Sequence, residues 1–339
     1  MQGTNRQVRL ASRPTGMVDD GTFEVVEEPI AELGPGEYLV RIAYLSIDPT
    51  NRVWIREEPS YLPPVGIGEV MRGGAVGEVV ESRNDEFPVG APVLGMLGWQ
   101  EYARCGRDVV ARVVPEGLPL PHLLSVYGTT GVTAYFGMLD VAKPEAGDTV
   151  VVSGAAGATG SVAGQIAKIQ GARVVGIAGT DEKCAWLTDE LGFDAAINYR
   201  TDDVAARLRE TCPDGIDVFF DNVGGAILDT VLTQLALRAR VALCGAISTY
   251  NAADRPAPIH AYMNLVVQRA RMEGFLVLDY LDRFPEAVLQ LVAWVGEGRI
   301  KWRDHIVDGL EQAPDALNML FTGANTGKLM VRVGADPAS

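Results

Sequence analysis

The sequence has few residues of the kinds that bind metals or form disulfides. Four cysteines and three histidines occur in 339 residues. No cysteine lies in a CxxC pair, and no HExxH segment or cysteine–histidine cluster has the spacing of zinc ligands. We therefore expect reduced thiols, as in a cytoplasmic protein, and no metal site.

Basic residues are also scarce. The chain has 29 lysines and arginines against 44 aspartates and glutamates, a formal net charge of −15. Nucleic acids and anionic membranes bind basic surfaces, so we expect neither as a partner. The N-terminus MQGTNRQVRL has no apolar run typical of a secretory signal. The uncharged stretch 149–167 is interrupted by glycines and polar side chains, which makes it too polar to predict a membrane span.

Two patterns divide the chain. From about residue 149, β-branched and apolar runs alternate with helix-like segments. The runs are 149–153, 173–179, 195–199, 216–222 and 240–247. This alternation predicts βαβ units and a parallel sheet covered on both faces, hence an α/β protein. Residues 1–125 instead contain short strands separated by proline and glycine, as in a partly open antiparallel β-barrel. The β run 328–333 follows a helix-like stretch and is expected to return to this first domain.

A glycine-rich segment, SGAAGATGSVAG (153–164), lies between a predicted strand and a predicted helix. Read as GxGxxG, its positions are Ala155, Gly157 and Gly160. Such glycines permit a tight turn and close approach of a pyrophosphate to a helix N-terminus. Because βαβ units follow it, the segment predicts a dinucleotide site. The alternative is a small-residue turn between a strand and a helix.

The end of the second strand favours NADP over NAD. NAD sites place an acidic residue there to bind the ribose 2′-hydroxyl, whereas this chain has Gly179 and Thr180. Thr180 is the expected helix N-cap. A lysine in the first turn of a helix is unfavourable because it opposes the helix dipole, so Lys183 indicates an anion beside it. Tyr199, after the third strand, could donate to the same 2′-phosphate. The alternatives are a solvated lysine and a tyrosine that packs at the core rim.

These residues resemble the medium-chain dehydrogenase/reductase superfamily, in its zinc-independent leukotriene/prostaglandin reductase and curcumin reductase-like branch of alkenal double-bond reductases. The resemblance rests on LSIDPTNR, SYLPPVGIGEVMRGGAVGEVVES, GAAGATGSVAGQIAK, LGFDAAINYR, DNVGG, LCGAISTYN and RMEGFLVLDY. It implies a GroES-like β-barrel catalytic domain, residues 1–125 and 305–339, and a Rossmann NADP-binding domain, residues 126–304. It also implies a homodimer that pairs through a sheet edge at residues 275–280.

The resemblance also implies a set of cofactor contacts. They are Gly157, Ala158, Thr159, Gly160, Thr180, Lys183, Tyr199, Asn222, Cys244, Gly245, Ala246, Ile247, Ser248, Tyr250, Phe275, Leu276, Val277 and Asn325. One segment departs from the branch, which usually reads DPYMR where this chain has DPTNR (48–52). We therefore expect an altered substrate pocket.

The resemblance implies NADPH-dependent, zinc-independent reduction of the C=C bond of α,β-unsaturated ketones or aldehydes, with hydride transfer to the β-carbon. For the hydroxyl that stabilises the enolate, the resemblance points to Tyr262. Tyr250, expected nearer the nicotinamide, is a second candidate, and a ribose hydroxyl of the cofactor could take this role instead. The alternative for either tyrosine is a structural aromatic residue. Two alternatives stay open. One is an NADPH-dependent quinone or carbonyl reductase, and the other is a non-enzymatic NADPH-binding sensor.

Overall fold

The computed structural model describes residues 3–58, 60–114, 117–253 and 257–335. Contacts within the chain divide it into two compact units. One unit runs to Leu124 and resumes at Asp304, and the other spans Ser125–Arg303. Within the described ranges, no helix is both long enough and apolar enough to cross a membrane.

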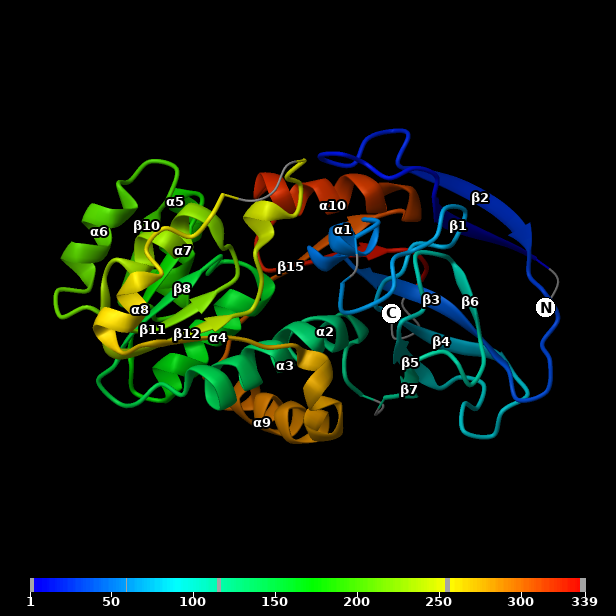
Figure 1. Ribbon diagram of the computed structural model, residues 1–339. Helices are drawn as coiled ribbons and strands as arrows, with labels where there is room; N and C mark the ends of the chain where they lie inside the picture. The colour runs from blue at the N-terminus through cyan, green and yellow to red at the C-terminus, as the bar shows by residue number, and fades with distance from the viewer. Residues whose placement is uncertain (1–2, 59, 115–116, 254–256, 336–339) are drawn as a thin grey trace. The chain divides into compact units, whose positions relative to one another are not determined.

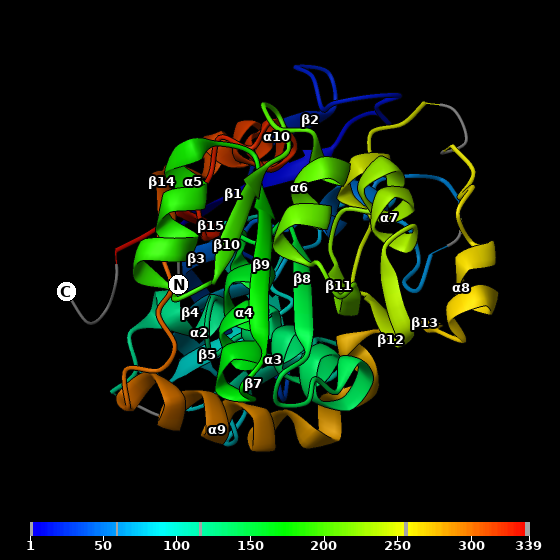
Figure 2. The ribbon, with the colours of Figure 1, turned by 90° about the vertical axis from the view of Figure 1, so that its left-hand side faces the viewer.

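The unit Ser125–Arg303 contains a six-stranded sheet with the order β10-β9-β8-β11-β12-β13 (Figure 2). Its strands are β8 (Thr149–Ser153), β9 (Arg173–Ala178), β10 (Ala195–Asn198), β11 (Ile216–Asp221), β12 (Leu235–Leu243) and β13 (Arg271–Gly274). Every neighbouring pair is parallel. The chain starts at the centre, runs outward through β9 and β10, and resumes on the other side at β11. This is the doubly wound order of a Rossmann fold, and the predicted parallel sheet is confirmed.

Helices cover the sheet on both faces. They are α3 (Thr129–Phe136), α4 (Ala158–Ile169), α5 (Asp181–Ala185), α6 (Val204–Thr211), α7 (Gly225–Leu232), α8 (Met263–Gln268) and α9 (Phe284–Gly296). Shorter π or 3₁₀ segments span Gly137–Ala142, Trp186–Glu190, Ile247–Thr249 and Val277–Arg283. Helices α3 and α4 pack together, as do α6 and α7. Right-handed crossovers on either side of β8 place these two groups on opposite faces.

The central strand and the helix after it follow directly from their residues. Val150, Val151 and Val152 of β8 are fully buried, as expected for a β-branched strand covered on both faces. In α4, Val162 and Ile166 are buried one turn apart and face the sheet. The predicted strand 149–153 and the helix that follows it are confirmed.

Two sequence-based boundaries are wrong. We expected a strand from residue 240, but β12 begins at Leu235 because α7 already ends at Leu232. We also expected residues 275–280 to form the sheet edge, whereas the edge strand is β13 and Val277–Arg283 is a 3₁₀ segment. The Tyr280 ring stacks on Phe136, with centroids 4.3 Å apart, and Arg283 forms an ion pair with Asp140. These contacts outweigh the β propensity of the apolar run.

The other unit, up to Leu124 and from Asp304, is called the barrel unit below. It contains a two-stranded ribbon and a seven-stranded mixed sheet. Its strands are β1 (Thr4–Leu10), β2 (Phe23–Pro29), β3 (Tyr38–Ser46), β4 (Ala75–Ser82), β5 (Pro92–Gly95), β6 (Tyr102–Cys105), β7 (Ala111–Val113), β14 (Asp304–Asp308) and β15 (Lys328–Arg332). Its helices are α1 (Thr50–Trp54), α2 (Leu120–Leu124) and α10 (Ala313–Thr322), and a 3₁₀ turn spans Leu310–Gln312. The main path is β14-β15-β3-β4-β5-β7, and β6 also pairs with β3.

The C-terminal strand completes this sheet, as the sequence predicted. β15 (red) pairs antiparallel with β3 (blue) through Met330, Val331 and Arg332 (Figure 1). Val331 and the β3 residues Ile42 and Leu45 are fully buried in one apolar core. A strand more than 280 residues along the chain from β3 is thus part of the same core.

Candidate functional site

The parallel sheet brings two polar strand ends together at its centre, where the strand order reverses between β8 and β11. Ser153 ends β8, and its hydroxyl donates to Asp221 Oδ1 at 2.6 Å. Asn222 Nδ2 donates to the Ser153 carbonyl at 2.7 Å. In open parallel sheets, ligands bind beyond the carboxyl ends of the strands at such a reversal point.

Asp221 organises the turn that follows β11. Its side chain is fully buried and accepts hydrogen bonds from the backbone N–H groups of Val223 and Gly224, in addition to Ser153. Burial raises the pKa of Asp221 above its usual value, and these hydrogen bonds oppose that shift. We expected Asn222 at this site but not Asp221, although an acidic residue at the end of an apolar strand can be recognised in the sequence.

The glycine-rich turn lies beside this pair and requires two of its glycines. Gly154 has φ +58°, which favours glycine. A Cβ on Gly160 would lie 2.4 Å from the Gly154 carbonyl oxygen, so a side chain cannot fit there. Gly157 is the N-cap of α4, and without a side chain it cannot cap the first-turn N–H groups. Those donors have no helical acceptors, so the turn fits an anionic group such as a pyrophosphate.

The segment 244–250 contacts the turn that follows β11. The backbone N–H of Ile247 donates to Asn222 O at 3.2 Å, and Ser248 Oγ donates to Val223 O at 2.6 Å. The Tyr250 hydroxyl accepts from the backbone N–H of Ala246 at 3.0 Å. The structure therefore brings the predicted residues from Cys244 to Tyr250 together with Asn222.

The residues predicted for a 2′-phosphate site lie around the ends of β9 and β10. Thr180 is the N-cap of α5, as expected, and its side chain accepts from the Lys183 backbone N–H at 3.2 Å. The Tyr199 ring lies against Gly179, where an added Cβ would be 3.1 Å from the tyrosine hydroxyl. Tyr199 is 45% exposed. Glycine at position 179 thus gives the tyrosine room over the end of the strand.

Arg200 is a second cation near the end of β9, and we did not expect it there from the sequence. Burial and the nearby positive charge of Arg200 lower the pKa of Lys183, against the opposing effect of Glu182. The Arg200 guanidinium carbon is 5.8 Å from the centroid of the Tyr199 ring. Lys183 and Arg200 together place two positive charges at the end of β9, in a chain of net charge −15. The position of Arg200, directly after β10 and Tyr199, was the available signal.

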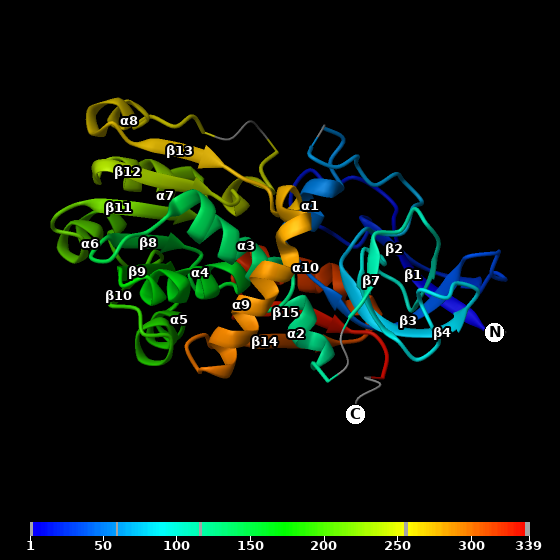
Figure 3. The same cartoon turned by 90° about the horizontal axis from the view of Figure 1, so that it is seen from below.

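The two candidate catalytic tyrosines lie in different places. Tyr250 belongs to segment 244–250, which contacts the turn that follows β11. Tyr262 precedes α8, and α8 ends at Gln268, just before β13 begins at Arg271, so this helix lies at the amino end of that strand (Figure 3). Tyr262 is 56% exposed. The structure thus groups Tyr250, and not Tyr262, with the predicted cofactor residues of this unit.

The predicted residues Phe275, Leu276 and Val277 follow the carboxyl end of β13, on the same edge of the sheet as the glycine-rich turn. The Phe275 ring meets Phe220 edge-on at a centroid distance of 6.1 Å. A Cβ on Gly137 would lie 2.3 Å from Phe275, so that ring is held by close packing.

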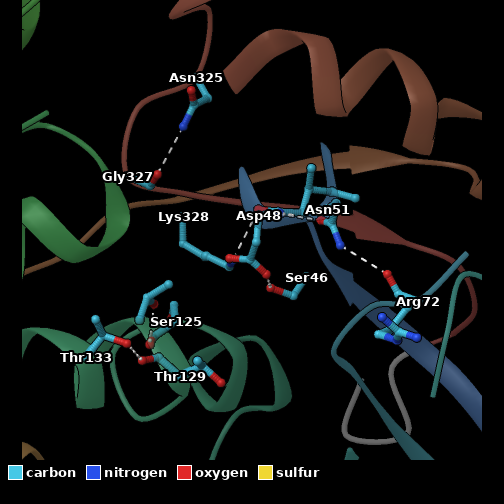
Figure 4. Close-up of polar contacts among 12 residues, drawn as sticks. Ser46, Asp48, Asn51, Arg72, Ser125, Thr129, Thr133, Asn325, Gly327 and Lys328 are labelled. Atoms are coloured by element: carbon cyan, nitrogen blue, oxygen red, sulfur yellow. Dashed lines mark hydrogen bonds and ion pairs between the residues drawn. The ribbon is translucent and has the colours of Figure 1, made fainter. Parts of the chain in front are cut away.

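The barrel unit carries the segment that departs from the related branch, residues 48–52 (Figure 4). Asn51 is buried, accepts from the backbone N–H of Asp48 at 2.8 Å and donates to Arg72 O at 3.1 Å. Asp48 forms an ion pair of 2.6 Å with Lys328, which is 2% exposed. Asn51 therefore holds the segment in place.

The predicted cofactor residue Asn325 is also buried in this unit and donates to Gly327 O at 3.1 Å.

Thr50, the other departure, has an aromatic partner. Its hydroxyl contacts the hydroxyl of Tyr61, a residue that is 43% exposed. Burial raises the pKa of Tyr61, so this phenol stays protonated at neutral pH. The pair presents a neutral donor–acceptor group on the barrel unit.

Metal-binding and thiol chemistry find little support among the described side chains. Across those ranges, no group of three or more His, Cys, Asp or Glu residues is placed to hold a metal ion. Burial and the charge of Asp221 raise the pKa of Cys244 to about 12, so its thiol stays protonated. A protonated thiol is a small, weakly polar group and a poor nucleophile.

Comparison with known families matches both parts of the chain. Residues 6–113 match the family described as the N-terminal domain of oxidoreductase, and residues 158–294 match the family described as zinc-binding dehydrogenase.

Close relatives cover nearly the whole chain. The NADPH-dependent curcumin reductase of Escherichia coli is 41% identical over 98% of each chain. The NADP-dependent 2-alkenal reductase of Nicotiana tabacum is 38% identical, again over 98% of each. The crystal structure of CurA from Vibrio vulnificus in complex with NADPH has a TM-score of 0.93 and 42% identity, and the match covers 97% of this chain and 99% of that one.

Proposed function

This chain belongs to the medium-chain dehydrogenase/reductase superfamily, in the branch of the curcumin and alkenal reductases, and on that premise we propose that it reduces the C=C bond of α,β-unsaturated ketones or aldehydes. It is an NADP-dependent oxidoreductase. The observation that carries the proposal is the pairing of a Rossmann crevice with a cationic site at the end of β9, in a chain whose relatives reduce alkenals and curcumin.

The cofactor contacts follow from the geometry of the parallel sheet. The α4 N-terminus and the turn at Gly157–Gly160 would hold the pyrophosphate, and Lys183 with Tyr199 would hold the 2′-phosphate. The segments 244–250 and 275–277 would border the nicotinamide half. We assign cofactor binding to residues 126–304, and the substrate pocket to residues 1–125 and 305–339, which would also supply Asn325.

When bound, NADPH supplies a hydride, which we expect at the β-carbon of the substrate. The enolate that forms carries negative charge on the former carbonyl oxygen, and its α-carbon takes a proton from water. The residues of this chain would align the two reactants and donate a hydrogen bond to that oxygen. Tyr250 is the first candidate for the donor because it lies in segment 244–250, whose backbone contacts Asn222 and Val223 at the carboxyl end of β11. Tyr262, or a ribose hydroxyl of the cofactor, is the alternative.

We infer that the reaction uses no zinc. Conjugate reduction needs charge stabilisation at one oxygen, which a hydroxyl donor can provide. The donor set supports this: cysteines and histidines are few and dispersed, and the described residues bring no metal-binding group together.

The decisive test offers purified protein three acceptors with NADPH and NADH. They are a small enone, its saturated ketone and a quinone, and the products are identified by mass spectrometry. We expect NADPH-dependent conversion of the enone to the saturated ketone and no reduction of the ketone itself. Faster turnover of the quinone or formation of an alcohol would overturn the proposal. NADPH binding without turnover of any acceptor would indicate the sensor alternative.

We also propose that two copies pair through the β13 edge. β13 ends the sheet, with β12 as its neighbour in the described part of the chain. The neighbouring helix α8 exposes Met263, Val266 and Val267, which are 53%, 65% and 60% accessible. An open strand edge beside apolar side chains favours association. The Val266→Glu variant should shift the mass measured by light scattering from dimer to monomer, whereas Leu289→Glu on exposed α9 should not. An unchanged mass for Val266→Glu would contradict this edge.

A further inference from the structure

A buried asparagine links the ends of β9 and β10. Asn198, the last residue of β10, is 6% exposed, and it pairs with Ala178, the last residue of β9. Its Nδ2 donates to Asp181 Oδ1 at 2.7 Å, and its Oδ1 accepts from the Arg200 backbone N–H at 3.1 Å. One side chain therefore fixes both the start of α5, which carries Lys183, and the turn that carries Arg200.

The same residue also forms hydrogen bonds with two acidic side chains of these segments. Asp181 is held by the Asn198 amide, and Asp202 Oδ2 accepts from the Asn198 backbone N–H at 3.0 Å. Both carboxylates are thus directed toward Asn198. Without these hydrogen bonds, they would be available to neutralise the neighbouring cations and weaken the attraction for an anion.

The Arg200 guanidinium lies over the ring of the tyrosine before it. The Tyr199 ring lies on Gly179, and the Arg200 guanidinium lies 5.8 Å from the centre of that ring. Stacking on an aromatic face leaves the edge of a guanidinium open to a phosphate. Lys183 and Arg200 are close enough for the charge of one to affect the other. A ligand of at least one negative charge would relieve that repulsion.

We propose that Arg200 is a second cationic contact for the cofactor's 2′-phosphate, and that Asn198 is the residue that positions it together with Lys183. This inference rests on the proposed cofactor site. It adds one binding residue and one positioning residue, neither of which the resemblance implied. A planar guanidinium can bind two phosphate oxygens, whereas a lysine ammonium acts as a point charge.

The test measures binding, not turnover, so that it stands apart from the enone reaction. Isothermal titration compares 2′,5′-ADP with 5′-AMP, because these probes differ in the 2′-phosphate alone. In Arg200→Gln, affinity for 2′,5′-ADP should fall about 10-fold while affinity for 5′-AMP stays unchanged. Arg209→Gln, an exposed arginine on α6 of the same unit, is the matched charge control and should change neither affinity.

The positioning role of Asn198 is tested by combining Asn198→Ala with Arg200→Gln in one protein. Asn198→Ala should weaken 2′,5′-ADP selectively, and its effect should be smaller when Arg200 is already Gln, because coupled residues are not additive. Asn5→Ala, at a buried bracing asparagine of the barrel unit, should lower the melting temperature and leave the 2′,5′-ADP to 5′-AMP ratio unchanged.

Equal losses for the two probes, or no loss in Arg200→Gln, would overturn the role of Arg200. Full additivity of the two variants would overturn the positioning role of Asn198. Either result leaves enone reduction by the wild-type protein intact. A wild-type protein that binds both probes equally would overturn the 2′-phosphate site itself.

Discussion

The two units of this chain build their candidate sites in different ways. In the parallel-sheet unit, strand order and backbone turns bring the groups together: Ser153 and Asp221 meet because β8 and β11 are neighbours in register. In the barrel unit, segment 48–52 is held by contacts with residues far along the chain: Asn51 donates to the Arg72 backbone carbonyl, and Asp48 forms an ion pair with Lys328. The glycines that such backbone turns require, as at Gly154 and Gly160, can be recognised in the sequence, whereas contacts between distant residues cannot. This difference explains why a cofactor is easier to infer than a substrate.

The largest effect is expected at Gly160, where the backbone leaves no room for a side chain. Gly160→Val would place carbon atoms against the Gly154 carbonyl, where even a Cβ would lie at 2.4 Å. We expect lost NADPH binding and destabilisation of about 1–3 kcal/mol from overpacking. Calorimetric titration and urea unfolding measure the two effects. Gly296→Ala, at a position with open space for a Cβ, is the control. Normal NADPH affinity in Gly160→Val would contradict the backbone site.

A smaller and more selective effect is expected at the cationic site. Lys183→Ala should weaken NADPH binding about 10- to 100-fold, the usual range for one charged hydrogen bond, and should leave NADH binding almost unchanged. Fluorescence titration with both cofactors measures the ratio. Equal losses for NADPH and NADH would remove Lys183 from the 2′-phosphate site.

The tyrosines provide a comparison within one unit. Tyr250→Phe should lower kcat for the enone by about 10-fold or more while NADPH affinity stays close to that of the wild type, because a donor to the developing enolate acts in the transition state. Tyr262→Phe should have a smaller effect. Steady-state kinetics with both variants decides between them. A larger loss of kcat in Tyr262→Phe would reverse the assignment, and unchanged kcat in both would favour the cofactor ribose.

The smallest effect concerns the barrel unit and pH. Burial lowers the pKa of His122 below its ordinary value of 6.5, although Asp304 opposes the shift. The folded protein therefore resists protonation that the unfolded chain accepts, and stability from this group is lost as the pH falls below 6.5. His122→Gln should show a shallower fall in melting temperature between pH 7.5 and pH 5. An equally steep fall would exclude His122 as a cause.

The sequence predicted the parallel unit well because its signals are local. The β-branched run 149–153, the glycines after it and the cap at Thr180 each depend on neighbouring residues. It failed where distant contacts decide the structure. Residues 277–283 became a 3₁₀ segment through ring stacking on Phe136, which no local pattern contains. Arg200 was missed for the same reason, since its significance depends on the packing of Tyr199 against Gly179.

In the barrel unit, distant contacts also decide the structure of segment 48–52. Thr50 and Asn51 were recognised as departures, but their partners Tyr61 and Arg72 lie on another segment. Only the folded structure shows that Asn51 is a buried brace, whereas Thr50 lies at a partly exposed phenol.

The central claim is that hydride reaches the β-carbon of an enone, and isotope transfer tests it most directly. NADPH that carries deuterium at the transferable position of its nicotinamide is turned over with a simple enone, and the product is analysed by NMR. We expect deuterium on the β-carbon of a saturated ketone. Deuterium on a carbinol carbon would show carbonyl reduction and would contradict hydride transfer to the β-carbon.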